Sequence, residues 1–166
     1  MPSDFQLYYP DDSFHFFDKL VDQKSSFYYI KTRDCESLSK RLASYREYTG
    51  RVTYQWHQES GLRRFDIPHI VLPNTQNLLM ALQHIRKSIH FGIYLVTGFN
   101  DGLRQPVALN EIQAYLNSYH SARKLIIFAD AQPQIPKEMQ AFFTEIKHTP
   151  LIESTSPLLQ PVIDYI

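Results

Sequence analysis

The sequence predicts an α/β fold: a three-layer sandwich with a mainly parallel, five-stranded sheet that carries helices on both faces. Short apolar runs alternate with segments whose apolar residues recur every three or four positions, which is the spacing of a helix packed on a sheet. The run 125–129 is apolar without interruption, as expected of a strand covered on both faces. Strands joined by crossover helices are therefore expected along the whole chain.

The first half of the chain predicts two helices and two strands. Ser13 is suited to cap the first helix, and Asp34 is suited to cap a second one, which Gly50 ends. The second helix carries an apolar stripe formed by Cys35, Leu38, Leu42 and Tyr45. The strands are expected at 27–32 and 51–57.

The second half predicts three helices and three strands. A capping signal at 73–75 precedes a helix with Leu78, Leu79, Leu82 and Ile85 turned inward. The next helix begins at Pro106 or Ala108 and displays Leu109, Ile112, Leu116 and Tyr119 on one side. Pro136 opens a short helix that runs through Ile146. The strands are expected at 91–97, 125–129 and 150–153.

Size and composition indicate one domain over 1–166, with a polar leader at 1–12 and a proline-containing segment at 154–166. Lys plus Arg and Asp plus Glu both number 17, so no global charge favours nucleic acid or an anionic membrane. The longest apolar runs are far shorter than the roughly 20 residues that span a bilayer. A single cysteine without a secretory leader indicates a reducing compartment, and we expect a cytoplasmic protein.

The turn after the first strand has no glycine, although a phosphate-binding loop needs glycines there to bring backbone N–H groups around the phosphate oxygens. None of the five glycines precedes a Lys-Ser or Lys-Thr pair. The seven histidines are scattered without the close pairs typical of metal sites. The sequence therefore predicts a protein that is not an enzyme and that holds no cofactor or metal.

Four polar residues are candidates for a small-ligand site at the carboxyl edge of the sheet. They are Arg33, Asp101, Arg104 and Asp130, which follow three of the predicted strands. Asp101 and Asp130 have a second interpretation as turn-forming residues. Cys35 near a helix start has the features of a nucleophile, but its place on an apolar stripe favours a buried structural thiol.

The stretch 59–66 is predicted to be a loop that forms an interaction surface. Arg63 and Arg64 stand near Trp56 and Phe65, a pairing of cations with aromatic rings that suits single-stranded nucleic acid or a phosphorylated partner. The alternative is that the two arginines are merely solvated, which the balanced net charge favours.

Several segments match, in order, those of a known family. They are 29–32 with Leu38 and Leu42, then 54–62, 79–85, 92–99, and 123–130 with 135–139. Together they resemble the region before the ATPase module in AAA-type ATPases of the hypothetical chloroplast reading-frame family. The resemblance implies a regulatory or partner-binding domain that stands alone here. It also implies a core like a degenerate P-loop ATPase with strand order 5-1-4-3-2, and it transfers no ATP-binding residue.

The leading functional hypothesis is a non-enzymatic domain that binds a protein, either an ATPase or a copy of itself. The alternative is a degenerate nucleotide or nucleic-acid binder that uses Arg33, Arg63, Arg64, Asp101 and Arg104. A third class, a hydrolase that uses Cys35 or Asp130, lacks a visible catalytic triad or carboxylate pair.

Overall fold

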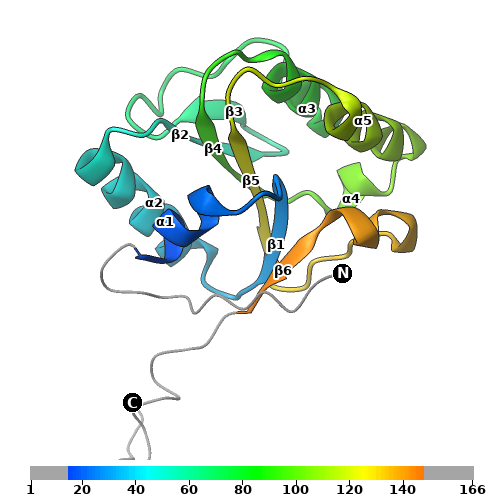
Figure 1. Cartoon of the computed structure of the whole chain (residues 1–166), viewed down its shortest axis with the longest axis horizontal. Coiled ribbons are helices and arrows are strands. Elements are labelled where there is room, and N and C mark those ends of the chain that lie inside the picture. Colours follow the sequence, from blue (N-terminus) through cyan, green and yellow to red (C-terminus); the bar gives the residue numbers. More distant parts are fainter. Residues whose placement is uncertain (1–14, 148–166) are drawn as a thin grey trace, which may run out of the picture.

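The computed structural model describes residues 15–147 as one sheet with helices on both faces (Figure 1). The helices are α1 (His15–Asp22), α2 (Cys35–Thr49), α3 (Leu78–Lys87), α4 (Asn100–Leu103), α5 (Pro106–Asn117) and the 3₁₀ helix η1 (Lys137–Phe142). The strands are β1 (Phe27–Lys31), β2 (Thr53–His57), β3 (Gly61–Arg64), β4 (Gly92–Thr97), β5 (Lys124–Asp130) and β6 (Thr144–Ile146). The predicted α/β class is confirmed.

The sheet has six strands in the order β3-β2-β4-β5-β1-β6. Five strands are parallel, and β3 pairs antiparallel with β2 at one edge. The predicted order of the four central strands agrees with β1-β5-β4-β2, but the prediction of five strands was wrong because it missed β3. The strand expected at 150–153 lies outside the described residues, and the position next to β1 is taken by β6.

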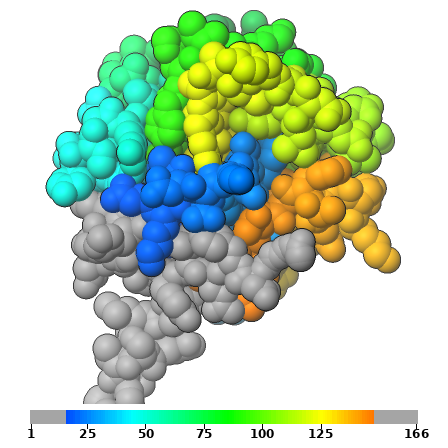
Figure 2. All heavy atoms as spheres, viewed as in Figure 1, coloured from blue at the N-terminus to red at the C-terminus, as the bar shows by residue number. Residues whose placement is uncertain are grey.

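The two faces of the sheet bury two separate apolar cores. Residues of β5 alternate between them: Leu125 and Ile127 face the core under α1 and α2, whereas Ile126 and Phe128 face the core under α3, α4, α5 and η1. Every residue of β4 is buried, as expected of a central strand with both faces covered. In the space-filling view, α5 lies above the orange segment of η1 and β6 (Figure 2).

The second helix follows its sequence prediction at both ends. The Asp34 side chain accepts a hydrogen bond from the N–H of Ser37 at 3.0 Å, which satisfies one of the free donors of the first turn. Gly50 has a φ of 77° in the left-handed region, and its N–H bonds to the carbonyl of Arg46 at 2.7 Å. Leu38, Leu42 and Tyr45 are buried as predicted.

Two helices begin or face differently from their prediction. The third helix was expected to be capped at 73–75, but α3 begins after Asn77, whose side chain accepts N–H groups from Leu79 and Met80. Leu79 is only half-buried. The inward face predicted for α5 is confirmed only in part: Ile112 is buried and Leu109 packs partly buried against the core, but the other buried residues are Ala108, Glu111 and Tyr115. Leu116 is 43% exposed and Tyr119, beyond the helix end, is 90% exposed.

The segment after Pro136 was predicted to be one helix through Ile146. The structure ends η1 at Phe142 and begins β6 at Thr144. A 3₁₀ helix has poor hydrogen-bond geometry and stays short, so the chain returns to an extended form and pairs with β1. The cap predicted at Ser13 lies outside the described residues.

Candidate functional site

The carboxyl ends of β2, β4 and β5 border a cavity of about 400 Å³ beside the first half of α2, here called the α2 cavity. It is lined by Cys35, Glu36, Ser39, Gln55, His57, Thr97, Gly98, Ala129 and Asp130. Two of these residues carry carboxylates, and no Lys or Arg is among them. This cavity therefore offers no cation to an anionic ligand such as a nucleotide phosphate.

The start of α2 is already occupied by a carboxylate of the chain. Asp34 accepts the N–H of Ser37, and the backbone N–H of Asp34 is bound in turn by the hydroxyl of Thr32 at 3.1 Å. Free N–H groups at a helix start are what binds phosphate in nucleotide-binding folds. Here a negatively charged side chain holds one of those groups, which disfavours a second anion.

Cys35 is the first residue of α2, and its side chain is half-buried. Burial raises the pKa of its thiol, and the carboxylates of Asp130 and Asp34 raise that pKa further. Its Sγ contacts the carbonyl of Thr32 at 3.8 Å. A thiol held in its protonated form is a poor nucleophile, so this environment favours the structural role over the catalytic one.

A second cavity, of about 350 Å³, lies on the opposite face of the sheet between α3, α4 and α5. This α3–α5 cavity is lined by Trp56, Gln58, Gln76, Asn77, Leu78, Leu79, Asp101, Gly102, Gln105, Val107 and Ala108. Trp56, Leu78 and Ala108 are buried, with exposures of 2%, 4% and 2%. The site combines an apolar interior with amide side chains, the composition typical of binding pockets.

Trp56 is fixed at this cavity by a buried hydrogen bond. Its Nε1 donates to the carbonyl of Thr75 at 2.6 Å, across a loop that returns to the sheet edge. The hydroxyl of Thr75 accepts the N–H of Leu62 at 2.9 Å and donates to the carbonyl of Leu72 at 2.7 Å. Thr75 is fully buried and therefore ties the loop to β2 and β3.

Gly102 allows α4 to approach the start of α3. A Cβ built at this position would lie 2.7 Å from Cδ2 and 2.8 Å from Cβ of Leu78. Such distances are shorter than van der Waals contact between carbon atoms, so a side chain there would push the two helices apart. The close packing of α4 on α3 at this wall of the cavity therefore requires glycine at position 102.

The polar groups of the α3–α5 cavity are mostly uncharged. The Asn77 side chain caps α3, and the Gln105 side chain donates to the carbonyl of Asp101 at 3.5 Å. The carboxylate of Asp101 pairs with Arg104. Within residues 15–147, the side chains of Gln58 and Gln76 make no hydrogen bond and are free to bind a ligand.

The four predicted ligand residues do not meet in one cavity. Asp130 lines the α2 cavity and Asp101 lines the α3–α5 cavity. Arg104 pairs with Asp101, donates to Gln134 at 3.1 Å, and lines a third cavity of about 410 Å³ between α5 and η1. Arg33 is exposed in the turn after β1 and lines none of these three cavities.

The predicted interaction surface is also rearranged. Trp56 is buried, so its ring faces the α3–α5 cavity rather than the solvent. Phe65 is partly buried against the core under α1 and α2. The stretch that was expected to be a loop contains β3, in which Arg63 pairs with Gln55 and Arg64 with Tyr54.

Both arginines of this stretch have partners. Arg64 donates to both carboxylate oxygens of Asp66, at 2.9 and 2.7 Å, which makes a two-point ion pair. Arg63 donates to the carbonyl of Pro68 at 3.4 Å. Arg46 of α2 also binds Asp66 at 2.9 Å. The arginines of this region therefore stabilise the edge of the sheet through contacts within the chain.

Sequence reasoning did not single out Gln58, Gln76 or Val107, because they lie on three separate segments. Two local signals pointed to the site. Asn77 precedes the apolar start of α3, and Pro106 stands at the first position of α5. Crossover helices of a parallel sheet begin at its carboxyl edge, so both signals place helix starts there.

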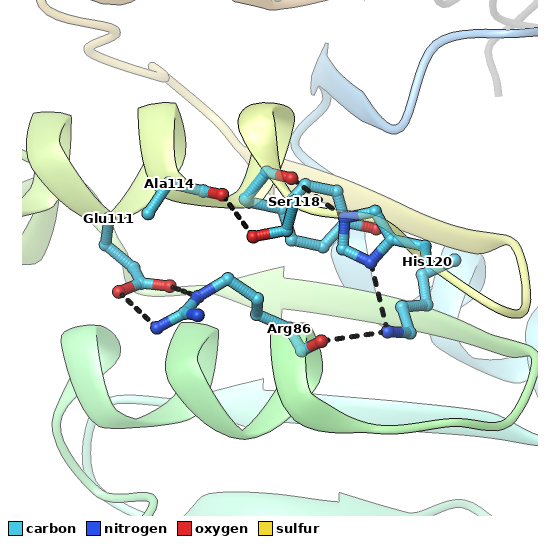
Figure 3. A network of polar contacts seen from close by, with 7 residues as sticks. Arg86, Glu111, Ala114, Ser118 and His120 are labelled. Carbon is cyan, nitrogen blue, oxygen red and sulfur yellow. Dashed lines mark hydrogen bonds and ion pairs between the residues drawn. The ribbon is translucent and has the colours of Figure 1, made fainter.

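A polar network ties α3 to α5 away from this cavity (Figure 3). Arg86 Nε donates to Glu111 Oε2 at 2.7 Å, and the Glu111 side chain is only 5% exposed. Lys124 Nζ donates to the carbonyl of Arg86 at 3.2 Å and lies 3.4 Å from Nδ1 of His120. The other ring nitrogen of His120 lies 2.8 Å from the carbonyl of Tyr115. The network holds the two helices that carry the cavity.

Lys124 is 1% exposed, and its burial lowers the pKa of the amine from its ordinary value of 10.5. Between the folded and unfolded pKa values, the native state binds fewer protons, so the free energy of unfolding rises with pH. We therefore expect the wild type to gain stability relative to Lys124→Met as the pH rises from 7 to 10. Urea denaturation across this range measures the shift.

The matched control is Lys87→Met, which removes an exposed lysine from the end of α3. Its stability difference from the wild type should change little with pH. A Lys124→Met difference that is equally flat would contradict the lowered pKa.

Among residues 15–147, no group of three or more His, Cys, Asp or Glu side chains is placed to hold a metal ion. None of the helices described is both long and apolar enough to cross a membrane.

Comparison with known protein families gives a match that covers the described residues. The sequence model of the family described as the N-terminal domain of SpoVK-like AAA ATPases matches residues 14–148. No curated protein and no solved structure matches the chain. The match supports the predicted resemblance to an AAA ATPase N-terminal domain, while the chloroplast reading-frame family itself is not what the match names.

Proposed function

Because the chain belongs to the family of SpoVK-like AAA ATPase N-terminal domains, we propose that it is a non-enzymatic protein-recognition domain of an AAA ATPase system. Its partner is an ATPase or a second copy of itself. The proposal includes the finer points of the resemblance: kinship with the chloroplast reading-frame family, and a core derived from a P-loop ATPase that lacks the phosphate-binding loop.

One observation carries the non-enzymatic part of the proposal. Asp34 binds the N–H of Ser37 at the start of α2, where a P-loop would hold phosphate. Glu36 and Asp130 add two carboxylates to the neighbouring cavity. The Asp130 carboxylate disfavours a triphosphate at this cavity, whereas Glu36 contributes less repulsion because it is highly exposed and pairs with Lys40 at 3.8 Å.

The observations on the other face of the sheet support protein recognition. The α3–α5 cavity holds apolar and amide groups, and its one carboxylate is paired. Such a lining has no Lys or Arg side chain to anchor the phosphates of a nucleotide. Its apolar and amide groups suit the side chains and peptide groups of a protein chain.

The test uses the purified full chain in two assays. In the first, thermal unfolding is followed with Mg-ATP, Mg-ADP and single-stranded oligonucleotides, with magnesium alone as the control. A bound ligand at about 100 times its Kd would stabilise the chain by roughly 2.7 kcal/mol. We expect no shift with any of these ligands.

In the second assay, the chain is mixed with a purified ATPase module of a SpoVK-like AAA protein, and complex formation is measured by calorimetry. Light scattering on the chain alone detects self-association. We expect one of the two to be seen. Stabilisation by a nucleotide or an oligonucleotide would favour the alternative function, and a monomer that binds no ATPase module would contradict the proposal.

A further inference from the structure

Exposed apolar side chains adjoin the buried interior of the α3–α5 cavity. Val107, in the first turn of α5, is 46% exposed and lines the cavity. Leu79 of α3 lines it from the other side and is half-buried. Trp56 and Leu78 are nearly inaccessible behind them. An apolar side chain that entered here would contact apolar atoms on several sides and would remove Val107 from water.

Two free amide groups stand at the same cavity. Gln58 follows β2 and Gln76 precedes α3, and neither makes a side-chain hydrogen bond within the described residues. Each amide has an oxygen that accepts and an NH₂ group that donates. A peptide group has the matching donor and acceptor, so a main chain lying across the cavity can bind both glutamines.

The side chains of the lining offer no unpaired charge to a ligand. The lining contains no Lys or Arg, and its one carboxylate, Asp101, is paired with Arg104. A phosphate would find no cation, and an ammonium group would compete with an existing ion pair. The complementary occupant is therefore uncharged where it enters the cavity.

The size of the cavity restricts the shape of the occupant. Its volume of about 350 Å³ lies at the lower end of the range for small-molecule sites, about 300–1,000 Å³. An amphipathic helix needs a longer groove, because it binds through several anchors spaced three and four residues apart. A single side chain on an extended segment needs only one cavity of this size.

We propose that the α3–α5 cavity binds an extended polypeptide segment of a partner protein. One uncharged apolar side chain of the segment packs against Trp56, Leu78 and Val107. Its neighbouring peptide groups bind Gln58 and Gln76. This inference rests on the proposed function and adds the place and the class of ligand that the domain recognises.

The probe is a displayed library of random peptides, selected on the full chain. We expect the selected peptides to share one position restricted to Leu, Ile, Met or Phe. The Kd of one synthetic peptide is then measured by fluorescence anisotropy. Val107→Glu places a charge at the cavity and should weaken binding at least about tenfold, which corresponds to about 1.4 kcal/mol.

Leu116→Glu is the matched control. Leu116 lies on the same helix with nearly the same exposure, 43% against 46% for Val107, and it lines none of the three cavities. The Kd of Leu116→Glu should stay within about twofold of the wild-type Kd. This is a much smaller change than the tenfold loss, or about 1.4 kcal/mol, expected for Val107→Glu. A glutamate in the first turn of a helix is favourable, so Val107→Glu should keep the chain folded.

The glutamines are tested by a second variant that changes no apolar group. Gln58→Ala with Gln76→Ala should weaken the same peptide severalfold without changing the restricted position in a new selection. Both glutamines are exposed, so this variant also keeps the fold.

Three results would overturn the inference: selected peptides that share no apolar position, a Val107→Glu chain that binds as the wild type does, or equal losses in Val107→Glu and Leu116→Glu. If these occur while the chain still binds the ATPase module, the proposed function stands and only the assigned cavity is wrong. Stabilisation by nucleotides would instead remove the proposed function.

Discussion

Replacement of Arg86 by methionine should lower the free energy of unfolding by about 3–5 kcal/mol, because it leaves the Glu111 carboxylate buried without its cation. Arg86 Nε lies 2.7 Å from Glu111 Oε2, and Glu111 is 5% exposed whereas Arg86 is 26% exposed. The arginine can reach water when its partner is lost, but the glutamate cannot. Urea denaturation followed by circular dichroism at pH 7 measures the loss.

The double variant Arg86→Met with Glu111→Leu separates the pair from the packing around it. Removal of both charges leaves no buried ion, so most of the stability lost in the single variant should return. Glu111→Leu alone leaves an arginine that is partly exposed, and it should be milder than Arg86→Met. If the double variant is as unstable as Arg86→Met, then the loss comes from packing and the electrostatic explanation is wrong.

The sequence predicted what depends on neighbouring residues. The start and end of α2 agree with the structure because Asp34 and Gly50 act within one turn of the helix. The buried strand at 125–129 agrees because five apolar residues in a row suit only a covered position. These features are set by neighbouring residues and do not depend on contacts with distant segments of the chain.

Part of the buried face of α5 was mispredicted because it depends on a distant residue. A pattern of hydrophobicity assigns Glu111 to the solvent, yet Arg86 of α3 pairs with it and allows its burial. Tyr119 was assigned to the inner stripe, but the helix ends at Asn117 before it can turn inward. A periodic pattern alone carries no information on either event.

The local structure around the predicted interaction surface was mispredicted for the same reason. The stretch with Arg63 and Arg64 looked like a loop, because a four-residue strand with two charges has a weak pattern of its own. It becomes a strand by pairing with β2. Cavities border the carboxyl edge, where the sequence predicted a small-ligand site, but which side chains share each cavity depends on helix packing that local sequence does not encode.

Thr75→Val is the second large effect that we expect, with a loss of about 2–4 kcal/mol from the free energy of unfolding. Valine has nearly the shape of threonine, so the change removes the hydroxyl and little else. It leaves the N–H of Leu62 and the carbonyl of Leu72 without the bonds of 2.9 and 2.7 Å that they now make. Each buried polar group left unpaired costs about 1–3 kcal/mol.

Thr75→Ser is the control, because it keeps the hydroxyl and removes only a methyl group, worth about 0.8 kcal/mol. Trp56 is the one tryptophan of the chain and donates to the carbonyl of Thr75, so its fluorescence reports on this loop. In Thr75→Val, we expect urea denaturation to begin at lower concentration with a red-shifted emission from Trp56. Equal stability of the valine and serine variants would show that the hydroxyl does not hold the wall of the α3–α5 cavity.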